Sequence, residues 1–134
     1  MELPIQIEIE GIPVPWKAHA GYGRRSYNPR ANEKEFYQFH IKRQYLHNLP
    51  LTIGVSLTAV YYLPIPQSIS KKIKEKMLSH RVRHIKRPDL DNLNKFLNDC
   101  IKGIVIKDDS QICHMITQKI YGEKPRTYIR IEPA

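Results

Sequence analysis

The chain has 134 residues, with 22 lysines and arginines against 13 aspartates and glutamates, a formal net charge of +9. A chain of this length is expected to fold as a single domain, residues 1–134, large enough to bury a core. Its charge favours polyanions as partners, with nucleic acid ahead of an anionic membrane, although a soluble protein can also be basic without such a partner.

The sequence lacks the features of membrane-spanning, secreted and zinc-binding proteins. No apolar run approaches the roughly 20 residues that a bilayer span needs. The first residues alternate apolar and polar side chains and do not resemble a signal peptide, so a cytoplasmic location without membrane contact is expected. The two cysteines, Cys100 and Cys113, lack the spacing of a zinc site and are both expected to pack in the core.

The chain begins with a predicted strand and a long loop. Residues 3–10 place apolar side chains on one face, which is typical of a half-buried strand. Residues 13–30 are rich in proline and glycine and predict a loop. Its aromatic and basic side chains suit base stacking and phosphate binding; alternatively, Trp16 packs on the core and the loop binds nothing. The side chains concerned are Trp16, Tyr22, Tyr27, Lys17, Arg24 and Arg25.

The middle of the chain predicts two helices around a central strand. Residues 31–49 predict a helix that ends before Pro50. Residues 51–63 carry little charge and are rich in valine, isoleucine, threonine and tyrosine, which indicates a central strand. Ser68 is expected to cap a short helix over residues 71–78. The first helix is expected to turn one face towards the core, formed by Phe36, Phe39, His40, Arg43 and Leu46.

The last part of the chain predicts one more helix and two strands. Residues 90–103 have an apolar stripe at helical spacing, opened by Pro88 and Asp89 and closed by Gly103. Strands are expected over residues 112–121 and 127–131, joined as a hairpin. The predicted class is therefore α+β, with a small mixed β-sheet covered by helices.

A basic segment leads directly into an acidic motif. Residues 71–87 contain eight lysines or arginines and one acid, Glu75. A charge run of this kind is often only a solvated surface. Here its position would deliver phosphates to the aspartates that follow. The residues expected to contact nucleic acid are Lys71, Lys72, Arg81, Arg83, Lys86 and Arg87.

Three aspartates in these basic surroundings, Asp89, Asp91 and Asp109, are candidate ligands for a hard divalent cation such as Mg²⁺. Each has a simpler explanation alone: Asp89 or Asp91 as an N-cap, Asp109 as a turn residue. Asp89 and Asp91 can converge only if the first turn is not regular helix, because positions i and i+2 point apart. Asp109 follows Asp91 by 18 residues, so a short return could bring it back near the helix.

The acidic motif resembles the signature of the RusA family of Holliday-junction resolvases, which includes prophage-encoded members. The matching residues are Pro88-Asp89-Leu90-Asp91-Asn92-Leu93-Asn94-Lys95, then Asp99, Gly103 and Lys107-Asp108-Asp109-Ser110-Gln111. The resemblance implies a homodimeric, RusA-like fold and a Mg²⁺-dependent endonuclease, with Mn²⁺ as an expected substitute. It implies cleavage of four-way DNA junctions by paired symmetric nicks, and no small-molecule cofactor.

The resemblance also implies roles for single residues. It places the metal-binding catalytic carboxylates at Asp89, Asp91 and Asp109 and the essential lysine at Lys95. Asp91, Lys95 and Asp99 share one side of the predicted helix, at intervals of four residues. The accessory candidates are Asp108, Asn92 and Asp99.

Three other functions stay open on the sequence alone. A metal-dependent nuclease that acts on flaps, single strands or RNA would use the same residues. A non-catalytic nucleic-acid-binding protein would explain the charge but not the aspartates. A basic partner-binding domain could use Tyr61 and Tyr62 as an interface.

Overall fold

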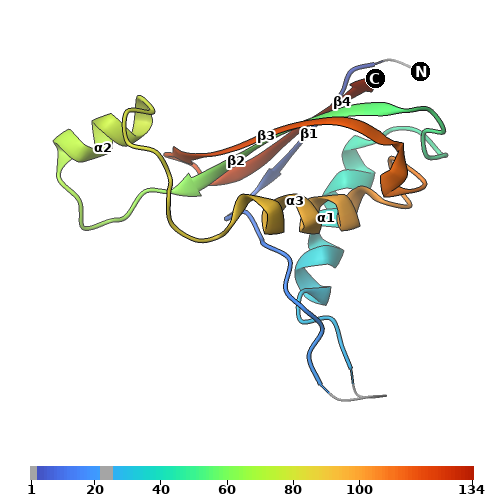
Figure 1. Ribbon diagram of the computed structural model, residues 1–134, viewed down its shortest axis with the longest axis horizontal. Coiled ribbons are helices and arrows are strands. Elements are labelled where there is room, and N and C mark those ends of the chain that lie inside the picture. Colours follow the sequence, from blue (N-terminus) through green and yellow to red (C-terminus); the bar gives the residue numbers. More distant parts are fainter. Residues whose placement is uncertain (1–2, 22–25) are drawn as a thin grey trace.

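The computed structural model describes residues 3–21 and 26–134, and its centre is one mixed sheet with the strand order β1-β4-β2-β3 (Figure 1). β4 pairs antiparallel with β1 and with β2, while β2 and β3 are parallel. The predicted α+β class with a mixed sheet is confirmed. The strands are β1 (Ile5–Glu10), β2 (Val55–Pro64), β3 (Ile112–Gly122) and β4 (Arg126–Pro133).

β2 is the central strand that its composition predicts. Its side chains alternate between buried and half-buried along nearly its whole length, so one face of the strand belongs to the core. The strand begins at Val55 rather than Leu51, because Leu51 forms only an isolated bridge with Ile106. The uncharged strand accepts partners on both edges, β4 on one side and β3 on the other.

The predicted hairpin between the last two strands is wrong. β3 and β4 are neighbours in the chain, but β2 lies between them. Neighbouring strands are about 4.8 Å apart, so the short connection crosses about 10 Å over the end of β2, a distance that three residues can span. At Gly122 a Cβ atom would lie 2.8 Å from the Cβ of Tyr62, so glycine is needed where the chain starts to cross.

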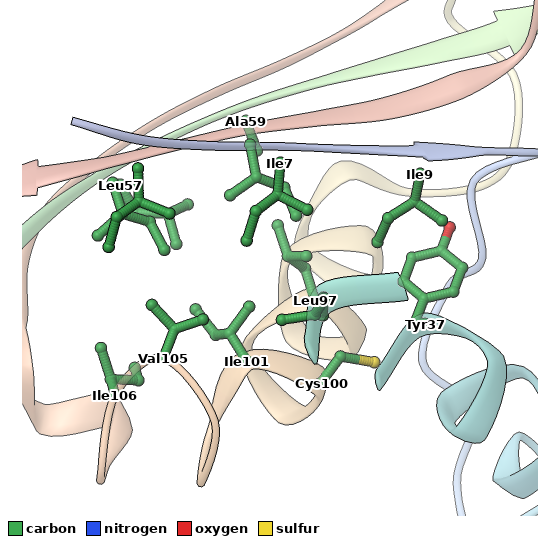
Figure 2. Close-up of a cluster of buried hydrophobic side chains, with 14 of the residues drawn as sticks. Ile7, Ile9, Tyr37, Leu57, Ala59, Leu97, Cys100, Ile101, Val105 and Ile106 are labelled. Carbon is green, nitrogen blue, oxygen red and sulfur yellow. The ribbon is translucent and has the colours of Figure 1, made fainter. Parts of the chain in front are cut away.

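Three helices accompany the sheet: α1 (Ala31–Gln44), α2 (Lys71–Leu78) and α3 (Leu90–Ile101). α1 and α3 lie on the same face of the sheet, and α2 extends beyond one end of it (Figure 1). The core fills the space between that face and the two helices (Figure 2). The other face of the sheet has no helix over it in the part of the chain that the structure describes.

α3 buries the stripe that its sequence predicts, whereas α1 does not. In α3, Leu93 and Leu97 are buried, as are Phe96, Cys100 and Ile101. In α1 the buried residues are Tyr37 and Ile41, while Phe39 is 61% exposed. The sequence pattern failed here because α1 is short of apolar residues on every face, so the predicted face of the helix was wrong. Phe36 of that face is also exposed, and Leu46 lies beyond the helix, because α1 ends at Gln44 and not at residue 49 as predicted.

Two smaller expectations are also corrected. The cap of α2 is Ser70 rather than Ser68: its hydroxyl accepts a hydrogen bond from the Ile73 N–H at 3.3 Å. Cys100 is buried, and burial raises the pKa of its thiol to about 12, but Cys113 is exposed and does not belong to the core. Among the described residues, no helix is long and apolar enough to cross a membrane.

Leu97 offers a direct test of this core. Its side chain is 1% exposed, so Leu97→Ala should lower the free energy of unfolding by about 2–5 kcal/mol, through lost burial and the cavity that remains. The matched control is Leu46→Ala, the same chemical change at a side chain that is 86% exposed, with an expected effect within about 0.5 kcal/mol. Urea denaturation measures both. Equal effects would show that α3 does not pack as described.

Candidate functional site

The two aspartates of the motif lie at the amino-terminal end of α3. Asp89 occupies the N-cap position with an extended backbone (φ −71°, ψ 142°), but its carboxylate makes no capping hydrogen bond. The extended backbone places Asp89 outside the regular helix, which is the condition for its side chain to converge with that of Asp91. The Asp91 carboxylate accepts a hydrogen bond from the adjacent Asn92 N–H at 3.0 Å.

Both carboxylates are exposed, and among the described residues neither takes part in an ion pair. They also lie at the positive end of the α3 dipole, which favours negative charge. Helix capping therefore does not account for Asp89. Both side chains are available to a ligand.

A pocket of about 520 Å³ lies beside Asp89. Its walls combine apolar rings with an arginine, an aspartate and an asparagine. Flat apolar side chains beside a guanidinium suit the bases and phosphates of a nucleic-acid strand. The lining residues are Pro15, Trp16, Arg87, Pro88, Asp89 and Asn92.

Trp16 connects the long loop to the start of α3. Its backbone N–H donates a hydrogen bond to the Asn92 carbonyl at 2.9 Å, and its ring packs against the edge of the core. The ammonium of Lys95 lies 3.5 Å from the centroid of that ring, as a cation–π contact. Trp16 therefore packs on the core, as the second interpretation expected, and it also forms a wall of the pocket, while its stacking on bases stays a prediction.

Lys95 is not bonded to the aspartate one turn before it. The described residues contain no ion pair between Lys95 and Asp91, although the two are four residues apart on α3. The ammonium lies instead over the ring of Trp16, a residue of the pocket wall. Asp99 is half-buried and lies two helical turns beyond Asp91, away from the pocket lining.

Asp109 lies at the opposite end of α3. It begins a short 3-10 helix, Asp109–Gln111, which leads into β3. Gln111 fixes this turn: its amide donates to the carbonyls of Leu51 and Ile53, at 2.8 and 3.0 Å. Its side-chain oxygen accepts from two backbone N–H groups at the start of the turn. Asp109 itself is exposed and forms no ion pair among the described residues.

Within one chain, two of the three predicted ligands thus lie at the same end of α3, and the third lies at the other end. The 12 residues of α3 span about 18 Å, with Asp89 and Asp91 at one end and the turn of Asp109 at the other. Residues 102–108, which follow α3, keep the turn of Asp109 near the carboxyl end of the helix, where Asp108 pairs with Lys102. Within residues 3–21 and 26–134, no cluster of three or more acidic, histidine or cysteine side chains could hold a metal ion.

Asp108 has a structural role that separates it from Asp109. Its carboxylate caps the 3-10 helix by accepting from the Ser110 N–H at 3.2 Å, and it pairs with Lys102 at 3.3 Å. The hydrogen bonds from Ser110, followed by the contact with Lys102, lower the pKa of this carboxyl to about 2. These contacts already occupy the group that was an accessory candidate for the site.

The lowered pKa of Asp108 predicts an effect of pH on stability. A carboxyl whose pKa falls from 3.8 to about 2 on folding stabilises the native state above pH 3.8 and loses this effect as pH falls towards 2. Asp108→Ala should therefore lower the melting temperature at pH 7, by less at pH 3, with Asp108→Asn retaining part of the cap. Thermal melts at the two pH values measure this. An equal decrease at both would contradict the assignment.

The predicted nucleic-acid contacts that the structure describes are all on the surface. Arg87 lines the pocket beside Asp89, and the others lie on the long loop, on α2 and on the segment between α2 and α3. Arg24, Arg25 and Tyr22 lie outside the described residues, and Tyr27 is exposed. The predicted contacts that the structure shows to be exposed are Lys17, Lys71, Lys72, Arg81, Arg83, Lys86 and Arg87.

Sequence reasoning assigned no role to two residues that organise this region. Gln111 holds the turn of Asp109, as described above. Lys119 of β3 donates hydrogen bonds to the carbonyls of Lys86 and Pro88, at 2.6 and 2.9 Å, immediately before Asp89. A signal for Lys119 was present: the alternation of β3 places this lysine opposite buried Tyr61, on the helix-covered face of the sheet.

Comparison with known proteins agrees with the motif at the start of α3. The family described as endodeoxyribonuclease RusA matches residues 15–132 of the chain. The chain is also 34% identical over 134 positions to the "Uncharacterized protein YqaN" of Bacillus subtilis (strain 168), with 95% of this chain and 94% of YqaN covered. Because the family matches nearly the whole chain, and both aspartates of the motif are exposed at the start of α3, this protein belongs to the RusA endodeoxyribonuclease family.

Proposed function

We propose that the protein is a Mg²⁺-dependent endonuclease that resolves four-way DNA junctions by paired symmetric nicks. The observation that carries this proposal is the pair of exposed carboxylates, Asp89 and Asp91, at the start of α3 and directly after an exposed basic segment, in a chain of this family. A non-catalytic DNA-binding protein would gain nothing from two carboxylates placed among arginines and lysines, because they repel phosphates.

The donor set fits a hard divalent cation. Carboxylate oxygens are the ligands that Mg²⁺ prefers, and among the described residues the one hydrogen bond to either carboxylate is that from the Asn92 N–H to Asp91. When bound, Mg²⁺ would supply the charge that polarises a phosphodiester and that lowers the pKa of water, so that the hydroxide that attacks is available near neutral pH.

The basic residues around the carboxylates would position the DNA. The exposed guanidinium of Arg87, at the pocket, suits a contact with a phosphate beside the cleavage point. Lys95 lies over the ring of Trp16, which lines the same pocket, and its ammonium would offset the charge that develops on the phosphate during attack. The apolar walls formed by Trp16 and Pro88 would limit the approach of the strand to one side.

A homodimer would complete the site as well as the reaction. Two symmetric cuts need two sites related by a two-fold axis, which a dimer of identical chains supplies. In a single chain Asp109 is a helix length away from Asp89 and Asp91. A two-fold axis that sets two α3 helices antiparallel would bring Asp109 of the partner subunit beside them. We therefore propose that each site takes Asp89 and Asp91 from one chain and the third carboxylate from its partner.

Cleavage of a synthetic four-way junction tests the proposal. The junction, a linear duplex and a flap are incubated with the wild-type protein or Asp91→Asn, with Mg²⁺ or with EDTA. Paired symmetric nicks on the junction alone, absent with EDTA and with the variant, are the expected result. Cutting of the flap or the duplex instead would retain the metal site but overturn the specificity. Binding without metal-dependent cutting would overturn the assignment as an enzyme.

A further inference from the structure

Lys119 lies on the helix-covered face of the edge strand β3. Its ammonium donates hydrogen bonds to backbone carbonyls rather than to a carboxylate. It donates to the Lys86 carbonyl at 2.6 Å and to the Pro88 carbonyl at 2.9 Å. Its neighbour on β2 is the buried Tyr61, so its side chain points to the face of the sheet that α3 covers. Lysine side chains seldom lie on the covered face of a sheet unless their charged group binds a partner there.

The two carbonyls belong to the segment that delivers Asp89. The Pro88 carbonyl is part of the peptide group that joins Pro88 to Asp89, so its orientation fixes the direction in which the Asp89 side chain leaves the backbone. The Lys86 carbonyl lies two residues earlier, on the other side of Arg87. One ammonium that holds both carbonyls therefore fixes the backbone on each side of Arg87 and immediately before Asp89.

A second contact attaches the same segment to β3. The ring of His84 lies 4.9 Å from the ring of Tyr121, two residues beyond Lys119. The pKa of His84 is lowered, chiefly by burial and then by the nearby Lys119, so this ring is neutral at neutral pH and adds no repulsion to the ammonium. The segment between α2 and α3 is thus bound to β3 at two points, whereas its arginines remain exposed.

We propose that Lys119 is a positioning residue of the metal site: it sets the orientation of Asp89, and thereby the affinity of the site for its divalent cation. This inference rests on the proposed function. Groups that orient a metal ligand without touching the metal typically change metal affinity or activity by about 10–100-fold when they are lost. Lys119 acts through the Pro88–Asp89 peptide group, so the loss should affect the metal rather than the DNA.

Three variants separate this role from a loss of charge or of stability. Lys119→Met keeps much of the side-chain length and removes both hydrogen bonds. Lys119→Arg keeps the charge and can donate to both carbonyls. Lys124→Met removes the same charge from another lysine of the β3–β4 region, whose ammonium pairs with Glu10 on the surface. Melting temperatures of all three are compared with that of the wild type.

The experiment measures Mn²⁺ binding in the absence of DNA, from the electron paramagnetic resonance signal of free Mn²⁺, and junction cleavage as a function of Mg²⁺ concentration. Lys119→Met should bind Mn²⁺ about 10–100-fold more weakly and need correspondingly more Mg²⁺ for half-maximal cleavage. Its affinity for the junction should match that of Lys124→Met. Lys119→Arg should restore most of the metal affinity, and Lys124→Met should keep that of the wild type.

Two results would overturn the inference. One is a Lys119→Met protein with the Mn²⁺ affinity and Mg²⁺ requirement of the wild type. The other is a loss of metal binding that Lys119→Arg does not restore and that follows the melting temperature, which would indicate a general structural role. Failure of the proposed function has a different signature, because the wild-type protein itself would then neither bind Mn²⁺ nor cut the junction.

Discussion

Mixed dimers of two inactive variants, Asp91→Asn and Asp109→Asn, are expected to recover nicking. Each variant alone should lose cleavage by roughly 10³-fold or more, because a ligand of the metal contributes several kcal/mol to the transition state. In a mixed dimer one site would combine both substitutions, and the other would combine intact Asp89 and Asp91 of one chain with intact Asp109 of the other. That second site should be active.

The proposed dimer predicts both how much activity is recovered and which product forms. Equal amounts of the two chains give mixed dimers as about half of the population, each with one active site of two, so about a quarter of the wild-type nicking is expected. A single site can cut only one strand, so the product should be a nicked junction rather than two resolved duplexes. Denaturing and native gels of a labelled junction measure both properties after the chains are unfolded together and refolded.

The matched control is the mixture of Asp89→Asn with Asp91→Asn. In the proposed dimer, Asp89 and Asp91 of each site come from one and the same chain. Each site of this mixed dimer would therefore carry one of the two substitutions, so no activity should return. If the first mixture also stays inactive although mixed dimers are present, all three carboxylates act within one chain. That result would require the turn of Asp109 to move by about the length of α3.

The sequence predicts most accurately the elements whose own residues decide their position. β2 is central because a long uncharged strand needs partners on both edges, and its composition predicts this. The stripe of α3 is also predicted, because its apolar residues repeat at helical spacing with a high contrast between the faces. The Asp-Leu-Asp motif directly before this stripe places Asp89 and Asp91 at a helix start with no structural information.

Arrangements that depend on distant partners were not predictable in the same way. Adjacent strands usually pair, so β3 and β4 were expected to form a hairpin, but β2 lies between them. The position of Asp109 depends on where β3 begins, and β3 is parallel to β2, so its start lies at the carboxyl end of α3. Neither feature is encoded in the spacing of the residues concerned.

The same limit applies to single side chains. α1 presents Tyr37 and Ile41 to the core because their neighbours in space are Phe96 and the sheet, not because of a pattern in the helix. The roles of Lys119 and Gln111 arise from backbone carbonyls of segments more than 30 residues away. Sequence can identify such a residue as unusual, as with an inward lysine in a strand, but not the group that it will bind.

Lys95→Ala is expected to lower the rate of cleavage by roughly 10²–10³-fold while leaving the affinity for the junction nearly unchanged. The ammonium of Lys95 lies over the ring of Trp16 and, in the proposed function, offsets charge that develops only in the transition state. Removing it should therefore reduce kcat rather than raise KM. Lys95→Arg, which keeps the charge but changes its shape, should recover part of the rate.

Trp16 determines how much of this effect depends on the position of Lys95. The cation–π contact at 3.5 Å is worth about 0.5–1 kcal/mol at an exposed site, so Trp16→Leu should slow cleavage roughly twofold to fivefold by releasing the ammonium. Trp16→Phe, which keeps an aromatic face, is the matched control and should stay closer to the wild type.

The double variant decides whether the two residues act together. If Trp16 acts only by holding Lys95, Trp16→Leu should have no further effect on the rate in a Lys95→Ala protein. An undiminished effect in that background would mean that Trp16 contacts the DNA directly, as a wall of the pocket that a base stacks against. Single-turnover rates of the four proteins at saturating protein concentration distinguish these results, because they measure cleavage independently of binding.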